Sequence, residues 1–203
     1  MAKPLPEEQM AELSADGLAK SVSAAQGGKK GLPPVHLWNP PFCGDLDMRI
    51  ARDGTWFYLG TPIGRPELVR LFSSILKLED GKYFLVTPGE KVGITVDDAP
   101  FVAVDFEREG LGKDQSLTFT TQVGDIVVAG EEHPIRVVRD PATGEPSPYV
   151  HIRRGLEALI DRKSFYRLVE IATVEEREGE DWLGLWSGRS FFPIIPAREL
   201  SGS

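Results

Sequence analysis

Two carboxylates, Asp45 and Asp47, stand two positions apart at the start of an expected strand. Successive side chains of a strand point to opposite faces, so these two would share a face about 7 Å apart. Carboxylates at such a separation act as acid and base in glycosidases, and carboxylates also bind metal ions. Because nothing else in the sequence indicates sugar chemistry, capping of a turn is the favoured interpretation. An acid–base or metal-ligand pair is the alternative.

The single cysteine, Cys43, follows His36 by seven residues. A thiolate–imidazole pair can act as a nucleophile only when the two side chains lie within hydrogen-bond reach. The stiff prolines between them do not guarantee that contact, so a small buried apolar side chain is the favoured interpretation of Cys43. The Cys43/His36 and Asp45/Asp47 regions together define the alternative function, a small-molecule hydrolase or transferase.

Sequence motifs of the common catalytic and nucleotide-binding loops do not occur. No stretch matches the phosphate-binding patterns G-x-x-x-x-G-K and G-x-G-x-x-G, or the nucleophile elbow G-x-S-x-G. We accordingly predict no catalytic residue and no metal ligand, and the sequence points to no cofactor. The favoured function is a non-enzymatic ligand-binding or interaction module.

Arginine and aromatic side chains surround a hairpin that is expected at residues 46–60. The planar fork of arginine matches carboxylate and phosphate groups, and an indole ring can stack on a flat ligand. We therefore predict a site for a small anionic ligand, or for a protein partner, at His36, Trp38, Asn39, Arg49, Arg52, Trp56 and Arg65. The alternative is internal pairing of Arg49 with Asp47, and of Arg65 with Glu67 or Asp98.

Charge and apolar content exclude several classes of protein. The 203 residues hold 23 basic and 31 acidic side chains, whereas nucleic-acid-binding surfaces are usually basic. No apolar run approaches the roughly 20 residues of a membrane span, and residues 1–10 lack the apolar core of a secretory signal. One cysteine excludes an internal disulfide framework. We expect a cytoplasmic protein that binds neither nucleic acid nor membrane.

One stretch departs from the acidic average of the chain. Its basic residues are too few for a nucleic-acid groove, and a solvated face is the favoured interpretation, with a small anion site as the alternative. These residues are Arg153, Arg154, Arg162, Lys163 and Arg167.

The chain from residue 31 begins with the period-two alternation of half-buried strands and then changes to helical spacing. Asp53-Gly54 is a signal for a two-residue hairpin turn. The expected elements are strands at 46–51 and 55–60, a helix from Pro66 to near Lys77, and strands at 83–86 and 92–96.

The rest of the chain shows a second series of strand and helix signals. Leu156, Leu159 and Ile160 stand at helical spacing and lead into a second helical run that starts at Phe165. The expected elements are strands at 101–106, 116–121, 125–128, 135–139 and 149–152, helical segments from Leu156 to Ala172, and a hairpin at 182–195.

Three pairs of segments are similar and follow the same order in the chain: 48–53 with 135–140, 67–72 with 164–169, and 83–89 with 182–188. They predict two copies of a β-β-α-β-β unit. The expected fold class is α+β, with two similar halves, each an antiparallel sheet with a packed helix. The expected parts are an N-terminal helix or flexible arm at 1–30, with Ser14 as a helix N-cap, a first half at 31–110 and a second half at 111–203.

Several blocks of sequence carry a family resemblance: 32–41 (LPPVHLWNPP), 44–50 (GDLDMRI), 53–56 (DGTW), 61–65 (TPIGR), 68–72 (LVRLF), 87–88 (TP) with 90–91 (EK), and 148–153 (PYVHIR) with 155–159 (GLEAL). They resemble the bacterial family of unknown function DUF1285, over about residues 32 to 195. The resemblance implies a two-part protein of α and β elements with repeated motifs and no established activity. It also implies a suggested role in signalling or sensing, and it supplies no catalytic residues.

Overall fold

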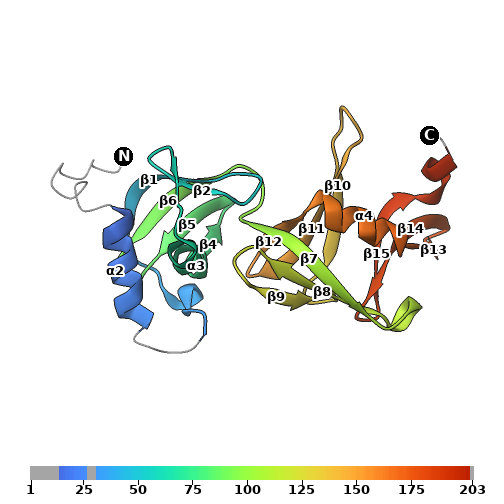
Figure 1. The fold of residues 1–203 in the computed structure, drawn as a ribbon, viewed down its shortest axis with the longest axis horizontal. Coiled ribbons are helices and arrows are strands. Elements are labelled where there is room, and N and C mark those ends of the chain that lie inside the picture. The colour runs from blue at the N-terminus through green and yellow to red at the C-terminus, as the bar shows by residue number, and fades with distance from the viewer. Residues whose placement is uncertain (1–13, 27–30, 202–203) are drawn as a thin grey trace. The chain divides into compact units, whose positions relative to one another are not determined.

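The computed structural model describes residues 14–26 and 31–201 of the chain. The chain divides into two compact units, Met1–Asp98 and Ala99–Ser203, which run from blue to green and from green to red in Figure 1. Each unit is built around one six-stranded sheet. The expectation of two similar halves is confirmed at this level, although both halves are richer in strands than predicted. The expectation of antiparallel sheets is wrong, because the two central strands of each sheet pair in parallel.

The first unit is a mixed sheet with helical segments. Its described elements are α2 (Ala15–Gln26), η1 (Val35–Leu37), β1 (Phe42–Ile50), β2 (Trp56–Tyr58), β3 (Thr61–Pro62), α3 (Pro66–Ser74), β4 (Leu76–Glu79), β5 (Lys82–Val86) and β6 (Lys91–Val96). The strand order is β3-β2-β1-β6-β5-β4. β1 and β6 pair in parallel at the centre, and the other neighbours are antiparallel.

Strand β1 has the alternation that its sequence predicts. Met48 and Ile50 are almost completely buried, whereas Asp47 and Arg49 are exposed. The Asp53-Gly54 turn is also confirmed, because Asp53 Oδ1 accepts a hydrogen bond from the Thr55 backbone N–H at 2.9 Å and β2 returns antiparallel to β1. This strand therefore presents polar side chains on one face of the sheet and apolar ones on the other.

Helix α3 ends earlier than predicted. Ile75 caps it, and the segment expected to complete the helix is strand β4, in which Leu76 pairs with Leu85 of β5. Ile75 and Leu76 are both buried, so the helical spacing that ends at Ile75 coincides with the first buried residues of a strand. Tertiary pairing with β5 decides between these two patterns.

The N-cap predicted at Ser14 is confirmed. Its hydroxyl oxygen accepts a hydrogen bond from the Gly17 backbone N–H at 3.0 Å, which satisfies one free donor in the first turn of α2. Leu18 and Val22 are buried on this helix, which packs against α3. The rest of the predicted N-terminal arm, residues 1–13 and 27–30, lies outside the described residues.

The second unit contains a six-stranded sheet and a separate three-stranded sheet. Its elements are β7 (Phe101–Glu109), η2 (Gly112–Asp114), β8 (Ser116–Thr121), β9 (Ile126–Val128), β10 (Ile135–Arg139), β11 (Pro146–Arg153), β12 (Leu156–Ile160), α4 (Arg162–Glu170), β13 (Thr173–Arg177), β14 (Glu180–Ser187), β15 (Ser190–Pro196) and η3 (Ala197–Ser201). The orders are β10-β11-β12-β7-β8-β9 and β13-β14-β15.

The boundary between the halves differs from the one predicted at 110/111. Strand β7 pairs with β8 and with β12, so it forms the centre of the second sheet. The structure therefore divides the chain at Asp98 and Ala99. The sequence prediction cut after β7 because glycines at 110 and 112 resemble a linker.

The first part of the predicted helical run, residues 156–160, is a strand and not a helix. Leu156, Ala158 and Ile160 alternate with less buried neighbours along β12, which pairs in parallel with β7. The second part is the helix α4, as predicted, and Asp161 Oδ1 caps it by accepting a hydrogen bond from the Ser164 N–H at 2.7 Å.

The two six-stranded sheets share one strand order. In each, the first three strands run from the centre to one edge, and the last three run from the other edge back to the centre. The predicted β-β-α-β-β repeat does not correspond to this arrangement. Its matched segments lie at different positions: β1 is central and β10 is an edge strand, α3 precedes β4 and α4 follows β12, and β14 lies outside the six-stranded sheets.

Candidate functional site

Arg49 lies on the exposed face of β1, because it alternates with buried residues such as Ile50. Its register partners are Phe57 on β2 and Thr95 on β6. The guanidinium carbon is 4.7 Å from the centre of the Phe57 ring, and Nη1 donates a hydrogen bond to Asp97 at 2.5 Å. An aromatic face and a carboxylate therefore hold this side chain in one position.

A hollow of about 200 Å³ opens beside Arg49. It lies beside a register shift in the parallel pairing of β1 with β6, in which Asp45 opposes Gly93 and Arg49 opposes Thr95. The four-residue interval from Asp45 to Arg49 on β1 thus lies opposite a two-residue interval on β6. The extra residues of β1 form a bulge in the pairing. The lining residues, which define the Arg49 hollow, are Leu46, Asp47, Met48, Arg49, Phe57, Gly60 and Thr95.

The other two predicted arginines do not line this hollow. Arg52 Nε lies 3.3 Å from Asp98 Oδ2, and Arg65 lies 3.9 Å from Asp16. All three arginines thus have carboxylate partners within the first unit, as the internal-pairing alternative expects, but the partners differ from those proposed from the sequence. Arg49 remains 44% exposed in its ion pair and is the predicted arginine that lines a hollow.

Trp56 belongs to the core and not to a ligand surface. It is 2% exposed, it pairs in register with Ile50, and its ring stacks on Phe72 of α3 with 6.3 Å between the ring centres. Because alternate residues of β2 face opposite sides, Phe57 shares the face of Arg49. The prediction that Trp56 stacks on a flat ligand is wrong, because its ring is buried in the core.

The three predicted residues of the arm also lie outside the Arg49 hollow. His36 and Asn39 are exposed, and Trp38 is half-buried. The Trp38 backbone carbonyl accepts a hydrogen bond from Lys77 Nζ at 3.1 Å. Trp38 is therefore tied to the sheet through its backbone.

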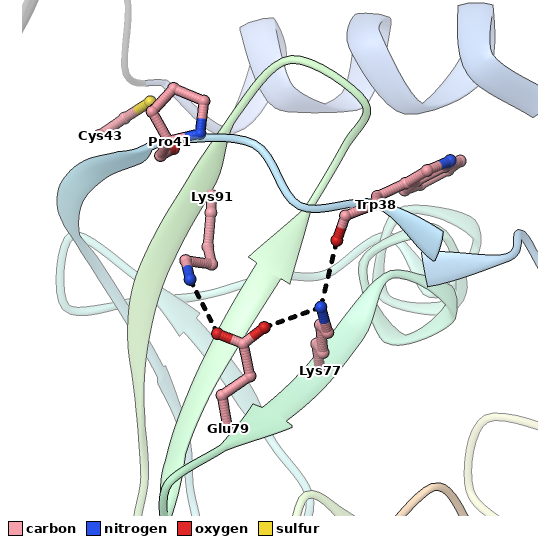
Figure 2. A network of polar contacts seen from close by, with 6 residues as sticks. All are labelled: Trp38, Pro41, Cys43, Lys77, Glu79 and Lys91. Carbon is pink, nitrogen blue, oxygen red and sulfur yellow. Dashed lines mark hydrogen bonds and ion pairs between the residues drawn. The ribbon is translucent and has the colours of Figure 1, made fainter. Parts of the chain in front are cut away.

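Lys77 belongs to an ionic network that the sequence prediction missed (Figure 2). Glu79 accepts contacts of 2.7 Å from both Lys77 and Lys91, and Lys91 also lies 5.0 Å from the centre of the Phe84 ring. The contact from Lys77, followed by that from Lys91, holds the pKa of Glu79 below its ordinary value. Reading residues 76–79 as a strand would have placed Lys77 and Glu79 on one face.

The structure does not bring together the side chains of either candidate catalytic pair, Cys43 with His36 or Asp45 with Asp47, in the part of the chain that it describes. Within the described residues, the Cys43 thiol donates to the Pro41 carbonyl at 3.4 Å and shares no hydrogen bond with His36. Asp47 lines the Arg49 hollow, whereas Asp45 lines a different hollow of about 290 Å³. Each hollow thus contains one of the two carboxylates, and Thr95 lines both hollows.

Gly93 explains how the Asp45 carboxylate lies against the sheet. A Cβ added at Gly93 would be 2.1 Å from Asp45 Oδ1, a distance that no side chain tolerates. The missing side chain on β6 thus leaves room for the carboxylate from β1.

Neither a metal centre nor a membrane helix occurs in the part of the chain that the structure describes. No group of three or more histidine, cysteine, aspartate or glutamate side chains is placed to hold a metal ion. No helix there is long and apolar enough to cross a membrane.

Ion pairs disperse the basic stretch of the second unit. Arg153 pairs with Asp125 at 2.6 Å, Arg162 with Glu145 at 2.7 Å, and Arg167 with Asp105 at 2.5 Å. The hydrogen bond from Arg167 also lowers the pKa of Asp105. These arginines come from β11 and α4 and have separate acidic partners. The exposed side chains of Arg162 and Arg167 support a solvated face, whereas that of Arg153 is only 13% exposed.

Comparisons with known proteins point to one family over both units. Residues 33–99 match the description "Domain of unknown function (DUF1285), N-terminal domain", and residues 100–194 match "Protein of unknown function (DUF1285), C-terminal domain". A search of curated proteins finds no match.

Two solved structures are similar to this chain. The crystal structure of a DUF1285 family protein from Silicibacter pomeroyi DSS-3 is 66% identical, with a TM-score of 0.83, over 92% of this chain and 99% of that one. A DUF1285 family protein from Shewanella baltica OS155 is 33% identical, with a TM-score of 0.48, over 62% of this chain and 91% of that one.

Proposed function

The chain belongs to the DUF1285 family, and we propose that it is a non-enzymatic module that binds a small anionic ligand in the Arg49 hollow. The observation that carries this proposal is the geometry of Arg49. The side chain rests on Phe57, and within the described residues its hydrogen bond runs from Nη1 to the Asp97 carboxylate, while Asp53 also attracts it electrostatically. The remaining guanidinium donors can bind a carboxylate or a phosphate.

The acidic neighbour of Arg49 restricts the ligand further. Asp47 lines the same hollow with an exposed carboxylate, and the Thr95 side chain lines it from β6. A bare anion would be repelled by Asp47, whereas a ligand that also carries a hydroxyl or amino group can donate a hydrogen bond to it. We therefore expect a small hydroxylated or aminated acid or phosphate.

Binding without chemistry suits a sensor, and we extend the proposal to a role in signal transduction within the cytoplasm. The Cys43 thiol is bonded to a backbone carbonyl, and Asp45 and Asp47 face different hollows. These positions favour binding over the hydrolase or transferase alternative. If the ligand is instead a protein partner, an acidic side chain of that partner would bind Arg49 in the same hollow.

The experiment compares Arg49→Ala with the natural chain by isothermal titration. The probes are glycerol phosphate, lactate and inorganic phosphate, with glycerol as the uncharged match. We expect glycerol phosphate or lactate to bind, and Arg49→Ala to weaken that binding by about tenfold to a hundredfold, the usual effect of losing a charged hydrogen bond. Arg65→Ala is the matched control, because Arg65 is exposed and lies outside the hollow.

Two results would overturn the proposal. One is that no charged probe binds the natural chain. The other is that Arg49→Ala and Arg65→Ala bind the charged probe equally well, since the hollow would then not contain the anion site.

A further inference from the structure

A second, apolar pocket lies entirely within the second unit. It is about 170 Å³ in volume and is partly enclosed. Strand β10 and the loop that follows it form one wall, α4 forms another, and β14, β15 and η3 complete it. The lining residues, which define the Arg139 pocket, are Arg139, Gly144, Pro146, Phe165, Val169, Leu183, Ile194, Ile195 and Leu200.

The side chains that line this pocket are mostly apolar. Seven of its nine lining residues have apolar side chains, and Arg139 is the charged one. Phe165 and Ile194 are buried, whereas Val169 and Leu200 are 38% and 47% exposed, so solvent reaches the pocket on their side. A cavity of about 150 Å³ with such walls holds a benzene-sized molecule. The pocket therefore fits one ring or a short branched chain.

A rigid loop positions Arg139. The Arg139 Nε donates a hydrogen bond to the Gly144 carbonyl at 3.3 Å. The Gly144 N–H in turn donates a hydrogen bond to the Asp140 carbonyl at 2.8 Å. The Asp140 carboxylate accepts the backbone N–H groups of Ala142 and Thr143, which lowers its pKa. Gly144 has φ of +72°, a conformation that favours glycine. The guanidinium is thus held at the rim of the apolar walls.

The protein's own carboxylate shows what Arg139 binds. Glu199 of η3 forms an ion pair with Arg139 Nη1, and Leu200, the next residue, lines the pocket. Arg139 therefore already binds a carboxylate, that of Glu199, and the next residue contributes an apolar side chain to the pocket. The side chains of Arg139 and Glu199 are 41% and 35% exposed, so another carboxylate can compete for Arg139.

We propose that the Arg139 pocket is a second binding site, for a small carboxylic acid with an aromatic ring or a short branched chain. The apolar body fills the space between α4 and β15, and the carboxylate replaces Glu199 on Arg139. Glu199 and Leu200 then lose their contacts with the pocket. This site is separate from the Arg49 hollow, and neither depends on the other.

The test uses the full chain and three probes: benzoate, its uncharged match benzamide, and acetate, which lacks the apolar body. Titrations followed by amide NMR report both affinity and location. We expect benzoate to shift signals from α4, β15 and η3 and to leave those of β1 and β2 unchanged. Benzamide and acetate should each bind at least about tenfold more weakly, because each lacks one of the two matched features.

Variants separate the roles of the two charged residues. Arg139→Gln should weaken benzoate binding at least about tenfold, and Arg136→Gln, on the same strand but outside the pocket, should not. Glu199→Gln should tighten binding, because it removes the internal competitor. Val169→Phe, at a half-exposed helix position, should fill the pocket and block benzoate without loss of the fold.

Three results would overturn this inference. The first is an absence of benzoate binding to the natural chain, and the second is equal binding by the natural chain and Arg139→Gln. The third is a Glu199→Gln variant that binds more weakly. Arg49→Ala should leave benzoate binding unchanged, so failure of this site and failure of the Arg49 hollow are distinguishable.

Discussion

At the residue scale, Glu79 is the centre of an ionic network in the first unit. It holds Lys77 and Lys91 from two different strands, and Lys77 continues the network to the Trp38 carbonyl in the arm (Figure 2). A central carboxylate with two cationic partners is stabilised in its charged form. The network therefore makes the stability of this sheet depend on pH.

We predict that Glu79→Gln lowers the free energy of unfolding by about 1 kcal/mol near neutral pH, as for partly exposed ion pairs. The folded pKa of Glu79 is lowered from the ordinary 4.5, so its stabilisation is complete above that value and is lost as the pH falls through the folded pKa. The difference between variant and natural chain should therefore shrink with acidification. Urea titrations at about pH 7 and about pH 3 measure it.

Glu107→Gln is the matched control, because Glu107 is an exposed strand residue whose side chain has no bonded partner among the described residues. It should show no difference at either pH. A Glu79→Gln variant with the same stability deficit at both pH values would contradict the electrostatic explanation.

At the element scale, the apolar spacing of a segment did not by itself distinguish helix from strand. Leu156, Leu159 and Ile160 fit one helical turn, yet Leu156 and Ile160 are also two buried positions of β12. The same ambiguity explains why the predicted helix ended near Lys77, within the strand β4. Turn and cap signals were more informative, because Asp53-Gly54 and Ser14 act through local hydrogen bonds that need no distant partner.

We predict that Asp161→Ala destabilises the second unit by about 1 kcal/mol, the typical effect of losing an N-cap. Asp161 caps α4, and this helix buries Phe165 and Leu168. Urea unfolding followed by circular dichroism measures the change. Asp161→Asn keeps an accepting oxygen and should retain most of the stability. Equal losses of unfolding free energy in both variants would show that Asp161 does not stabilise the protein as an N-cap.

At the scale of the whole molecule, the sequence allowed the prediction of two halves and of the family, whereas the ligand site at Arg49 stays a prediction. The Arg139 pocket was not predictable, because Arg139 and Leu200 are distant in sequence and meet only through the three-stranded sheet. Trp56 was misassigned because a shift of one residue along a strand reverses the face. The alternation of buried and exposed residues along β1 was thus predictable, whereas the face of Trp56 on β2 and the contacts between distant strands were not.

The position of β7 leads to a prediction about independent folding. Residues 99–203 contain all strands of the second six-stranded sheet, and they bury Phe101, Phe119 and Leu156 in it. A fragment cut at the predicted boundary, residues 111–203, lacks β7 and loses the partner of both β8 and β12. We expect the longer fragment to fold alone and the shorter one to fail.

Amide NMR spectra of the two fragments and the full chain test this prediction. Most signals of fragment 99–203 should superimpose on those of the full chain, and fragment 111–203 should show the narrow dispersion of an unfolded chain. A folded 111–203 would place the boundary where the glycines at 110 and 112 suggested. The expected outcome instead follows from hydrogen bonding: without β7, β12 and β8 each expose a row of unpaired backbone groups and the apolar surface that Phe101 and Phe106 covered.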